Sequence, residues 1–382
     1  MTHMLLAVIY AAFISLGLPD ALLGSAWPLM YPEFQVPVSR AGVVFMIISA
    51  GTVVSSLMSD KLTRRFGTGK VTALSVMLTA VALMGFSCCT SFWMLCLWAV
   101  PYGLGAGSVD ASLNNYVALH YASRHMSWLH CMWGIGASVG PYIMGGILTM
   151  GLRWNMGYRI IGLLQIALTA VLFLSLPLWK KSVTEDDSQS LSPELNLTQI
   201  LRIPGAVESM VMFFCYCALE QTAGLWASSY LVLHKGVSSE SAAAFASMFF
   251  TGIAVGRAAS GFLTIKFNDT QMIRLGQSVI ALGIAIMLLP FGQTLSLAGF
   301  ILSGLGCAPI YPCVIHSTPE RFGAGNSQAV IGVQMASAYI GTSLMPPLFG
   351  LVAEHIDVAL LPAYLLAILA TMTLMHERLL RK

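Results

Sequence analysis

Apolar stretches long enough to cross a membrane recur along the whole chain, and they limit its fold more than any other feature. A helix needs about 20 apolar residues to span the hydrocarbon core of a bilayer. Charged residues make up only 9% of the chain, against about 25% in soluble domains. We therefore predict an all-α membrane protein with twelve transmembrane helices. The predicted spans are 4–26, 41–59, 71–90, 93–119, 127–150, 158–179, 206–233, 241–265, 272–292, 295–316, 326–353 and 358–376.

A longer polar segment at residues 180–204 divides the predicted spans six and six. We predict an N-terminal six-helix bundle at 1–179, a cytoplasmic linker at 180–204 and a C-terminal six-helix bundle at 205–382. Two pseudo-symmetric halves with a binding site at the bilayer midplane are an architecture of secondary transporters.

The distribution of Lys and Arg indicates the orientation of the chain. With both termini in the cytoplasm, fourteen of the 19 Lys and Arg residues fall in inner segments and four in outer loops, while Arg257 lies within a span. Cytoplasmic loops of membrane proteins carry such an excess. We predict a multi-pass protein of the plasma (inner) membrane with both termini cytoplasmic. The net charge of +3, without a long basic run, argues against nucleic acid as a partner, and we expect a monomer.

The loop after the second span reads SLMSDKLTRR over residues 56–65. It resembles the signature loop of the major facilitator superfamily, G-x-x-x-D-R-x-G-R-R. Asp60, Arg64 and Arg65 match, whereas Ser, Lys and Thr replace the first glycine, the first arginine and the second glycine. The resemblance covers the whole chain and implies that Asp60 and Arg64 gate the cytoplasmic side. The alternative is that the basic residues only set the topology.

A narrower resemblance lies in spans 1, 4 and 5. Span 4 contains DASLNNY, which is similar to the E-x-x-x-N-P-Y stretch of the fucose–proton symporter family, with Asp110 in place of Glu and Asn115 in place of Pro. Span 1 contains LPDALL, similar to that family's N-D-x-L-L segment, and His130 stands where the family has a glutamine. The resemblance implies that Asp20 and Asp110 are proton-coupling acids.

Ionisable side chains inside a membrane are costly, by at least about 2.5–3.5 kcal/mol each, and often mark a function. Asp110 and Asn114 share a helix face because they are four residues apart, and His130 on the next helix can join them. A carboxylate removed from water takes up a proton more readily, as a proton-coupled carrier requires. A structural ion pair or a helix cap is the alternative for these acids. The predicted proton-coupling residues are Asp20, Asp110 and Glu220.

Two of the intramembrane charges have further interpretations. Glu220 is also a candidate for binding substrate hydroxyl groups, across a cavity that it is expected to share with the two aspartates. Arg257 is predicted to be a gating residue that pairs with a carboxylate at the cytoplasmic end or with helix carbonyls, rather than with substrate.

Sugar sites combine aromatic faces with amides and carboxylates that bind hydroxyl groups. Pro309 and Pro312 flank Tyr311 and predict an interrupted helix in span 10, with a plain kink as the alternative. The predicted substrate-binding residues are Asn114, Asn115, His130, Trp133, Gln221, Trp226, Tyr311 and Gln334.

The chain contains no soluble-enzyme motif and no nucleotide-binding loop, so we predict no enzyme activity, no cofactor and no metal. The first hypothesis is a proton-coupled symporter for a sugar or a similar small polar solute. The second is a proton antiporter that exports drugs or metabolites. It is favoured by the stretch GASVGPYIMGG from Gly136 to Gly146, which resembles an antiporter motif, although such small residues also allow close helix packing. A receptor or scaffold is the third. The solute, the direction of transport and the choice between protons and sodium stay open.

Overall fold

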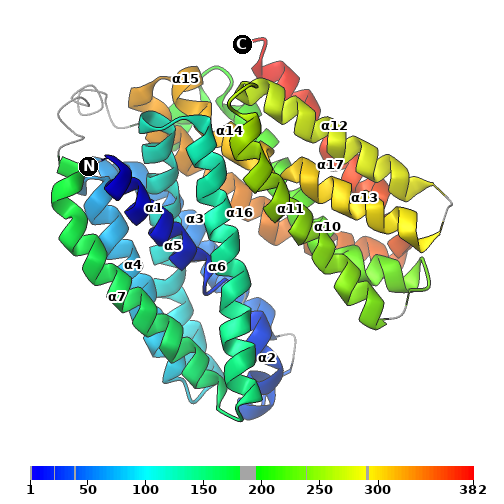
Figure 1. Cartoon of the computed structure of the whole chain (residues 1–382), viewed down its shortest axis with the longest axis horizontal. Coiled ribbons are helices and arrows are strands. Elements are labelled where there is room, and N and C mark those ends of the chain that lie inside the picture. The colour runs from blue at the N-terminus through cyan, green and yellow to red at the C-terminus, as the bar shows by residue number, and fades with distance from the viewer. Residues whose placement is uncertain (1, 21, 38–39, 181–194, 238, 290–291) are drawn as a thin grey trace. The chain divides into compact units, whose positions relative to one another are not determined.

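The computed structural model describes residues 2–20, 22–37, 40–180, 195–237, 239–289 and 292–382. These residues form helices and connections and contain no strand (Figure 1). Contacts between residues divide the chain into two compact units. Unit 1 consists of Met1–Tyr116, Leu129–Glu194 and Ala324–Gly332, and unit 2 of Val117–Trp128, Leu195–Gly323 and Val333–Lys382.

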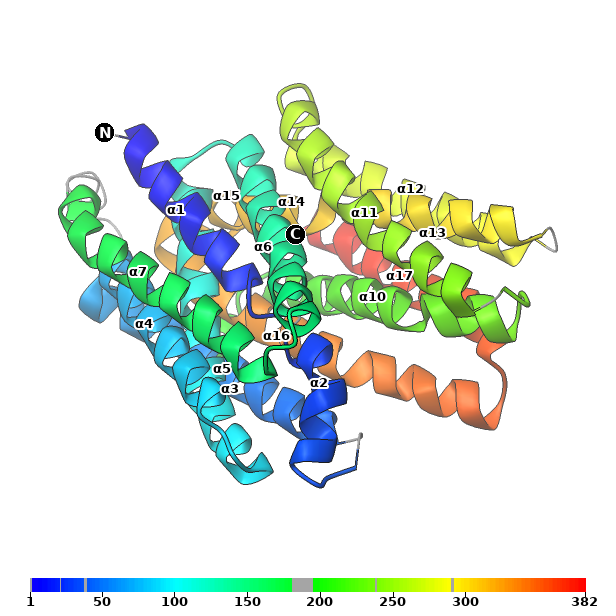
Figure 2. The same ribbon diagram turned by 60° about the horizontal axis from the view of Figure 1, so that its bottom comes forward.

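Unit 1 is built mainly from the first half of the chain. Within it α4 and α7 lie side by side in both ribbon views (Figures 1 and 2). Its helices from the first half of the chain are α1 (Thr2–Gly17), α2 (Leu22–Glu33), α3 (Ala41–Phe66), α4 (Thr68–Ser87), α5 (Phe92–His120), α6 (Ser123–Thr149) and α7 (Trp154–Lys180).

Unit 2 holds most of the second half, and α12 and α13 run side by side in it (Figure 2). Its helices are α9 (Leu197–Leu201), α10 (Ala206–Leu233), α11 (Ser239–Leu263), α12 (Asp269–Leu288), α13 (Gln293–Cys307), α14 (Ile310–His316), α15 (Thr318–Phe322), α16 (Ala324–His355), the 3-10 helix η3 (Val358–Leu360) and α17 (Leu361–Leu379). Three helices, α5, α6 and α16, contribute residues to both units.

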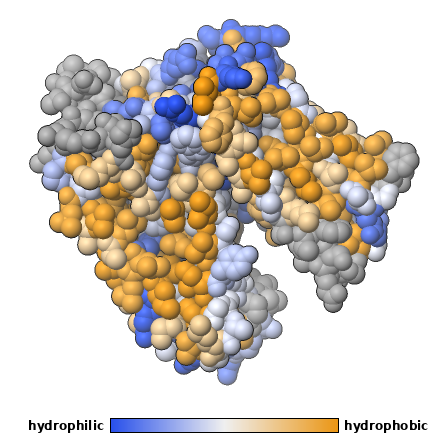
Figure 3. Space-filling model, in the orientation of Figure 1, coloured by the Kyte–Doolittle hydropathy of each residue, from blue (hydrophilic) through white to orange (hydrophobic). Residues whose placement is uncertain are grey.

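The helices confirm the predicted fold class. In the part of the chain that the structure describes, ten helical stretches are long and apolar enough to cross a membrane, and Met248–Leu263 of α11 is a shorter apolar helix. With α10, each predicted span has a counterpart. Large apolar side chains such as Trp93 and Leu174 are exposed on the helices, and Figure 3 shows apolar residues over much of the visible helix surface. Such faces suit lipid rather than water.

The first predicted span is two helices, because Pro19 interrupts it. Proline has no backbone N–H, so the carbonyl of Ser15 loses its donor four residues on. The side-chain amide of Gln165 on α7 donates to this carbonyl at 2.7 Å, and Thr79 donates to the Gln165 oxygen at 2.7 Å. The freed backbone group is thereby satisfied, and the chain turns between α1 and α2 at Asp20.

The predicted interruption of span 10 is also present. α13 ends at Cys307 and α14 begins at Ile310, so the break falls at Pro309, whereas Pro312 lies inside α14. Residues 181–194 of the predicted linker, with Lys181, lie outside the described residues, and the domain boundaries stay a prediction.

Candidate functional site

Three of the predicted site residues form a continuous chain of contacts in unit 1. The Asn114 amide donates to Asp110 Oδ1 at 2.8 Å, one turn earlier on α5. Asn114 Oδ1 lies 3.0 Å from His130 Nε2 on α6. Phe13 of α1 packs edge-on against the His130 ring, with ring centroids 5.4 Å apart. Asn114 is fully buried, His130 nearly so and Asp110 half-buried, so α5 and α6 hold a carboxylate, an amide and an imidazole in one row.

Asp20 lies at the break between α1 and α2 and is tied to α6. The indole Nε1 of Trp133 donates to Asp20 Oδ2 at 2.9 Å, and the Tyr102 hydroxyl of α5 interacts with the same carboxylate. Asp20 also lies close enough to Asp110 for their charges to interact. The two acids therefore belong to one polar region, with Trp133 and Tyr102 beside Asp20.

Close packing of α1 on α6 brings these groups together. A Cβ on Gly136 would lie 2.0 Å from the Ile14 carbonyl oxygen, and a Cβ on Gly140 would lie 1.9 Å from that of Leu18. Only glycine permits such backbone contact. By contrast, nothing lies within 4 Å of a Cβ added to Gly145.

Asn115 points elsewhere, although it follows Asn114 directly. Its side-chain oxygen accepts a hydrogen bond of 2.6 Å from Ser327, in the part of α16 that belongs to unit 1. Successive residues on a helix are about 100° apart, so the two asparagines face different neighbours. The structure does not bring Asn115 to the row formed by Asp110, Asn114 and His130.

The predicted gating pair is close to the first turn of α16. Arg64 Nε lies 3.0 Å from each carboxylate oxygen of Asp60, and Arg64 Nη2 donates to the Gly325 carbonyl at 3.0 Å. Gln328 donates to Ser59 at 3.3 Å. Residues 56–65, which were expected to form a loop, are the C-terminal turns of α3, and they bind the N-terminal end of α16 within unit 1. Their gating role stays a prediction.

Unit 2 contains its own cluster of charged and polar side chains between its helices. Arg257 Nη2 of α11 lies 3.5 Å from Glu220 Oε2 of α10, with side chains only 4% and 15% exposed. Tyr216 donates to the same carboxylate oxygen. Tyr311 stands nearby, with its ring centroid 6.0 Å from that of Tyr216 and its hydroxyl 3.1 Å from the Met335 sulfur. A carboxylate, a guanidinium and two phenols therefore meet in unit 2.

This geometry corrects the expected partner of Arg257. We expected a carboxylate at the cytoplasmic end or helix carbonyls, but Arg257 pairs with the mid-helix Glu220. The physical reason is burial: the guanidinium cannot lose its charge, and the carboxylate one helix away balances it.

The other predicted residues of unit 2 are not gathered at this pair. Gln221 is exposed. Trp226 donates to the Pro346 carbonyl at 3.0 Å and packs on Phe349. Gln334 is fully buried, donates to Ser209 at 2.6 Å and accepts from Thr318 at 3.2 Å. A cavity of about 430 Å³ is lined by Trp226 but not by Glu220 or Arg257.

Two groups were missed by the sequence reasoning. Tyr216 lies four residues before Glu220, so helical spacing would have found it. Tyr102, by contrast, lies on α5 and contacts Asp20 at the break between α1 and α2. Spacing within one helix cannot predict a contact between two distant segments.

Comparisons with known proteins place nearly the whole chain in one family of membrane proteins. "Bypass of stop codon protein 6" of Saccharomyces cerevisiae is 22% identical over 400 residues, which cover 95% of this chain and 79% of that protein. The "Uncharacterized transporter y4wD" of Sinorhizobium fredii is 23% identical over 353 residues, 90% of each chain.

Solved structures share the fold at low sequence identity. FucP in the outward conformation has a TM-score of 0.79 at 13% identity and covers 97% of both chains. The proton:xylose symporter XylE, bound to 6-bromo-6-deoxy-D-glucose, has a TM-score of 0.79 at 11% identity, over 97% of this chain and 94% of that one. A family model described as Major Facilitator Superfamily matches residues 9–346. The chain is therefore a multi-pass membrane protein that belongs to the Major Facilitator Superfamily.

Proposed function

We propose that this protein is a secondary active transporter that takes up a sugar or a similar small polar solute together with protons, by alternating access of its two halves. We place it in the plasma (inner) membrane, with both termini cytoplasmic. The observation that carries the proposal is the row of Asp110, Asn114 and His130, joined at 2.8 and 3.0 Å. The fold shared with FucP, which is a fucose:proton symporter, and with XylE supports it.

The row suits an acid that changes its protonation state during transport. An amide both donates and accepts hydrogen bonds, so Asn114 can donate to an ionised Asp110 or, after rotation, accept from a protonated one. His130, on the other side of Asn114, then exchanges its own hydrogen bond with the rotated amide. Asp20, held by Trp133 and close to Asp110, is the second coupling acid.

Glu220 differs from these acids because Arg257 pairs with it. Protonation of Glu220 would remove the negative charge that faces a guanidinium only 4% exposed. We therefore propose that Glu220 and Arg257 bind solute hydroxyl groups, with Tyr311 beside them, and that proton coupling depends mainly on Asp20 and Asp110. Trp133 offers the aromatic face in unit 1.

Transport by purified protein in proteoliposomes tests the coupling. Asp110→Asn is expected to abolish solute accumulation driven by a pH gradient while solute exchange across the membrane persists, because the amide keeps the shape but not the proton. Glu377→Gln is the matched control, since Glu377 pairs with Arg274 at 2.7 Å on an exposed surface, where such pairs contribute little. Accumulation by Asp110→Asn at the level of the unmodified protein would refute the assignment. A thermal-shift screen with sugars, polyols and drugs first identifies the solute.

A proton antiporter is the second candidate, because of the glycine-rich stretch in α6. The contacts of Gly136 and Gly140 with the α1 backbone account for two of these glycines through packing alone, and we therefore rank symport first. The direction of proton movement separates the two: when solute is added outside, a symporter acidifies the liposome interior, whereas an antiporter makes it more alkaline.

A further inference from the structure

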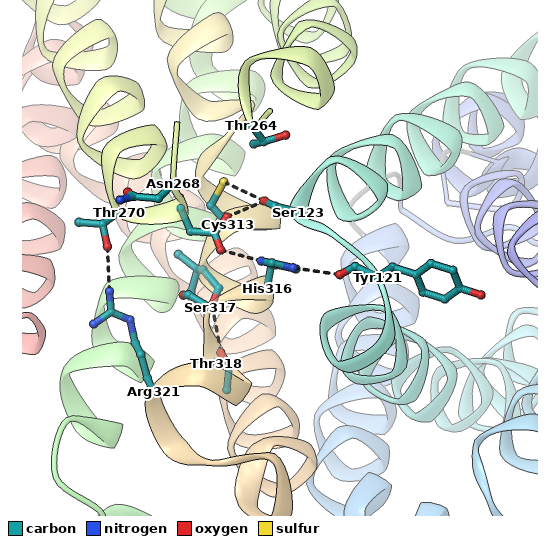
Figure 4. A network of polar contacts seen from close by, with 12 residues as sticks. Tyr121, Ser123, Thr264, Asn268, Thr270, Cys313, His316, Ser317, Thr318 and Arg321 are labelled. Carbon is teal, nitrogen blue, oxygen red and sulfur yellow. Dashed lines mark hydrogen bonds and ion pairs between the residues drawn. The ribbon is translucent and has the colours of Figure 1, made fainter. Parts of the chain in front are cut away.

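A polar cluster in unit 2 lies where α12 begins and α14 ends (Figure 4). Asp269 is the first residue of α12 and His316 the last of α14. His316 Nδ1 lies 2.6 Å from Asp269 Oδ2, and the Ser123 hydroxyl donates to Asp269 Oδ1 at 2.5 Å. His316 Nε2 lies 3.1 Å from the backbone oxygen of Tyr121. One imidazole therefore holds the connection between α5 and α6 directly through Tyr121 and indirectly through Asp269 and Ser123.

The cluster contains one more proton than a neutral imidazole and a carboxylate supply. The Tyr121 carbonyl can only accept, so Nε2 carries a hydrogen. A neutral imidazole then has no hydrogen left for Nδ1, which faces a carboxylate oxygen at 2.6 Å. A further proton must lie between Nδ1 and Oδ2, on whichever atom carries it. If this proton leaves, one of the two contacts of His316 becomes an encounter of two lone pairs.

In the described part of the chain, few groups that can bind or release a proton lie close to the His316–Asp269 contact, and both side chains are largely shielded from solvent. The side chains of His316 and Asp269 are 21% and 12% exposed. The charged groups that act on them include Glu320 of α15, near His316, and Arg321, which acts on Asp269 and donates to Thr270 at 3.0 Å. The Cys313 thiol interacts with Asp269 as well.

We propose that this shared proton is a pH-dependent latch that holds the connecting segment, Val117–Trp128, on α12 and α14. With the proton bound, His316 keeps both of its contacts, and loss of the proton releases the segment. The latched state holds one proton more than the released state, so a rise in pH favours release. Asp269, His316 and Ser123 act as positioning residues, and the predicted orientation puts them under the control of cytoplasmic pH.

Hydrogen–deuterium exchange of the full-length protein tests the latch without a known solute. Peptides from the connecting segment are compared at pH 6 and pH 8.5, after correction for the intrinsic exchange rate. We expect faster exchange at the higher pH in the unmodified protein. His316→Gln is expected to exchange about tenfold faster or more at pH 6, the size that corresponds to losing a hydrogen bond to a charged group, and to lose the pH dependence.

Two comparisons make the result decisive. His316→Arg keeps a cationic donor at both pH values and is expected to restore protection at both. Glu377→Gln breaks another pair that involves α12, with Arg274, and is expected to leave the connecting segment unchanged. The proposal is overturned if exchange of the segment in the unmodified protein does not depend on pH, or if His316→Gln keeps the same pH dependence. If His316→Gln does not fold, the pH series of the unmodified protein decides alone.

Discussion

Glu220→Gln is expected to destabilise unit 2 more than Arg257→Met, although both substitutions break the same ion pair. The guanidinium side chain is 4% exposed and the carboxylate 15% exposed. After Glu220→Gln, Arg257 keeps its charge, because arginine cannot lose its proton in a protein. After Arg257→Met, Glu220 can take up a proton and remain bonded to Tyr216. Removing the carboxylate is therefore expected to lower the stability of unit 2 more than removing the guanidinium.

The expected magnitudes follow from burial. Leaving a buried charge without its partner costs about 3–5 kcal/mol, and we take about 3 kcal/mol for Glu220→Gln because Arg257 retains other contacts. Arg257→Met is expected to cost about 1–2 kcal/mol, near the value of one hydrogen bond to a charged group. For units of about 200 residues, 1 kcal/mol corresponds to about 2–4 °C in Tm. The expected decreases are thus about 6–12 °C and about 2–8 °C.

Thermal unfolding of the detergent-solubilised variants, followed by intrinsic tryptophan fluorescence, measures the difference. The double variant is expected to lose much less stability than the sum of the two single losses, because it leaves no unbalanced charge. Equal Tm values for the two single variants, or an additive double variant, would refute the reasoning.

Two further predictions concern the packing of unit 1. Gly140→Ala is expected to lower stability by about 1–3 kcal/mol, the usual cost of overpacking, because its Cβ meets the Leu18 carbonyl, whereas Gly145→Ala has open space and is expected to be neutral; thermal unfolding of both compares them directly. Gln165→Leu is expected to cost about 1–3 kcal/mol by leaving the Ser15 carbonyl without its donor, and Pro19→Ala is expected to recover part of this loss by restoring a backbone N–H. No recovery in the double variant would contradict the role given to Gln165.

Helical spacing predicted local contacts well, because residues four apart share a face. Asp110 and Asn114 are bonded as that spacing requires, and His130 on the following helix joins them. The count and approximate limits of the spans were predictable for a similar reason, since apolar length alone determines what can cross a bilayer.

Partners between distant segments were not predictable, because periodicity tells which residues share a face but not what that face meets. Glu220 and Gln221 are neighbours in sequence, yet one pairs with Arg257 and the other is exposed. Asn115 likewise bonds Ser327, far along the chain. Such contacts depend on the three-dimensional neighbourhood of each helix face.

The glycine contacts between α1 and α6 have a mechanical consequence. Cβ atoms built on Gly17, Gly136 and Gly140 would all lie within 2.1 Å of a backbone oxygen of the other helix. Where backbone packs directly on backbone, no flexible side chain can move aside, so the contact resists sliding of one helix along the other. The C-terminal turns of α1 and the facing turns of α6 therefore move together as a rigid body, and the Asp20 carboxylate is hydrogen-bonded to Trp133. These contacts are therefore expected to hold the spacing of α1 and α6 constant.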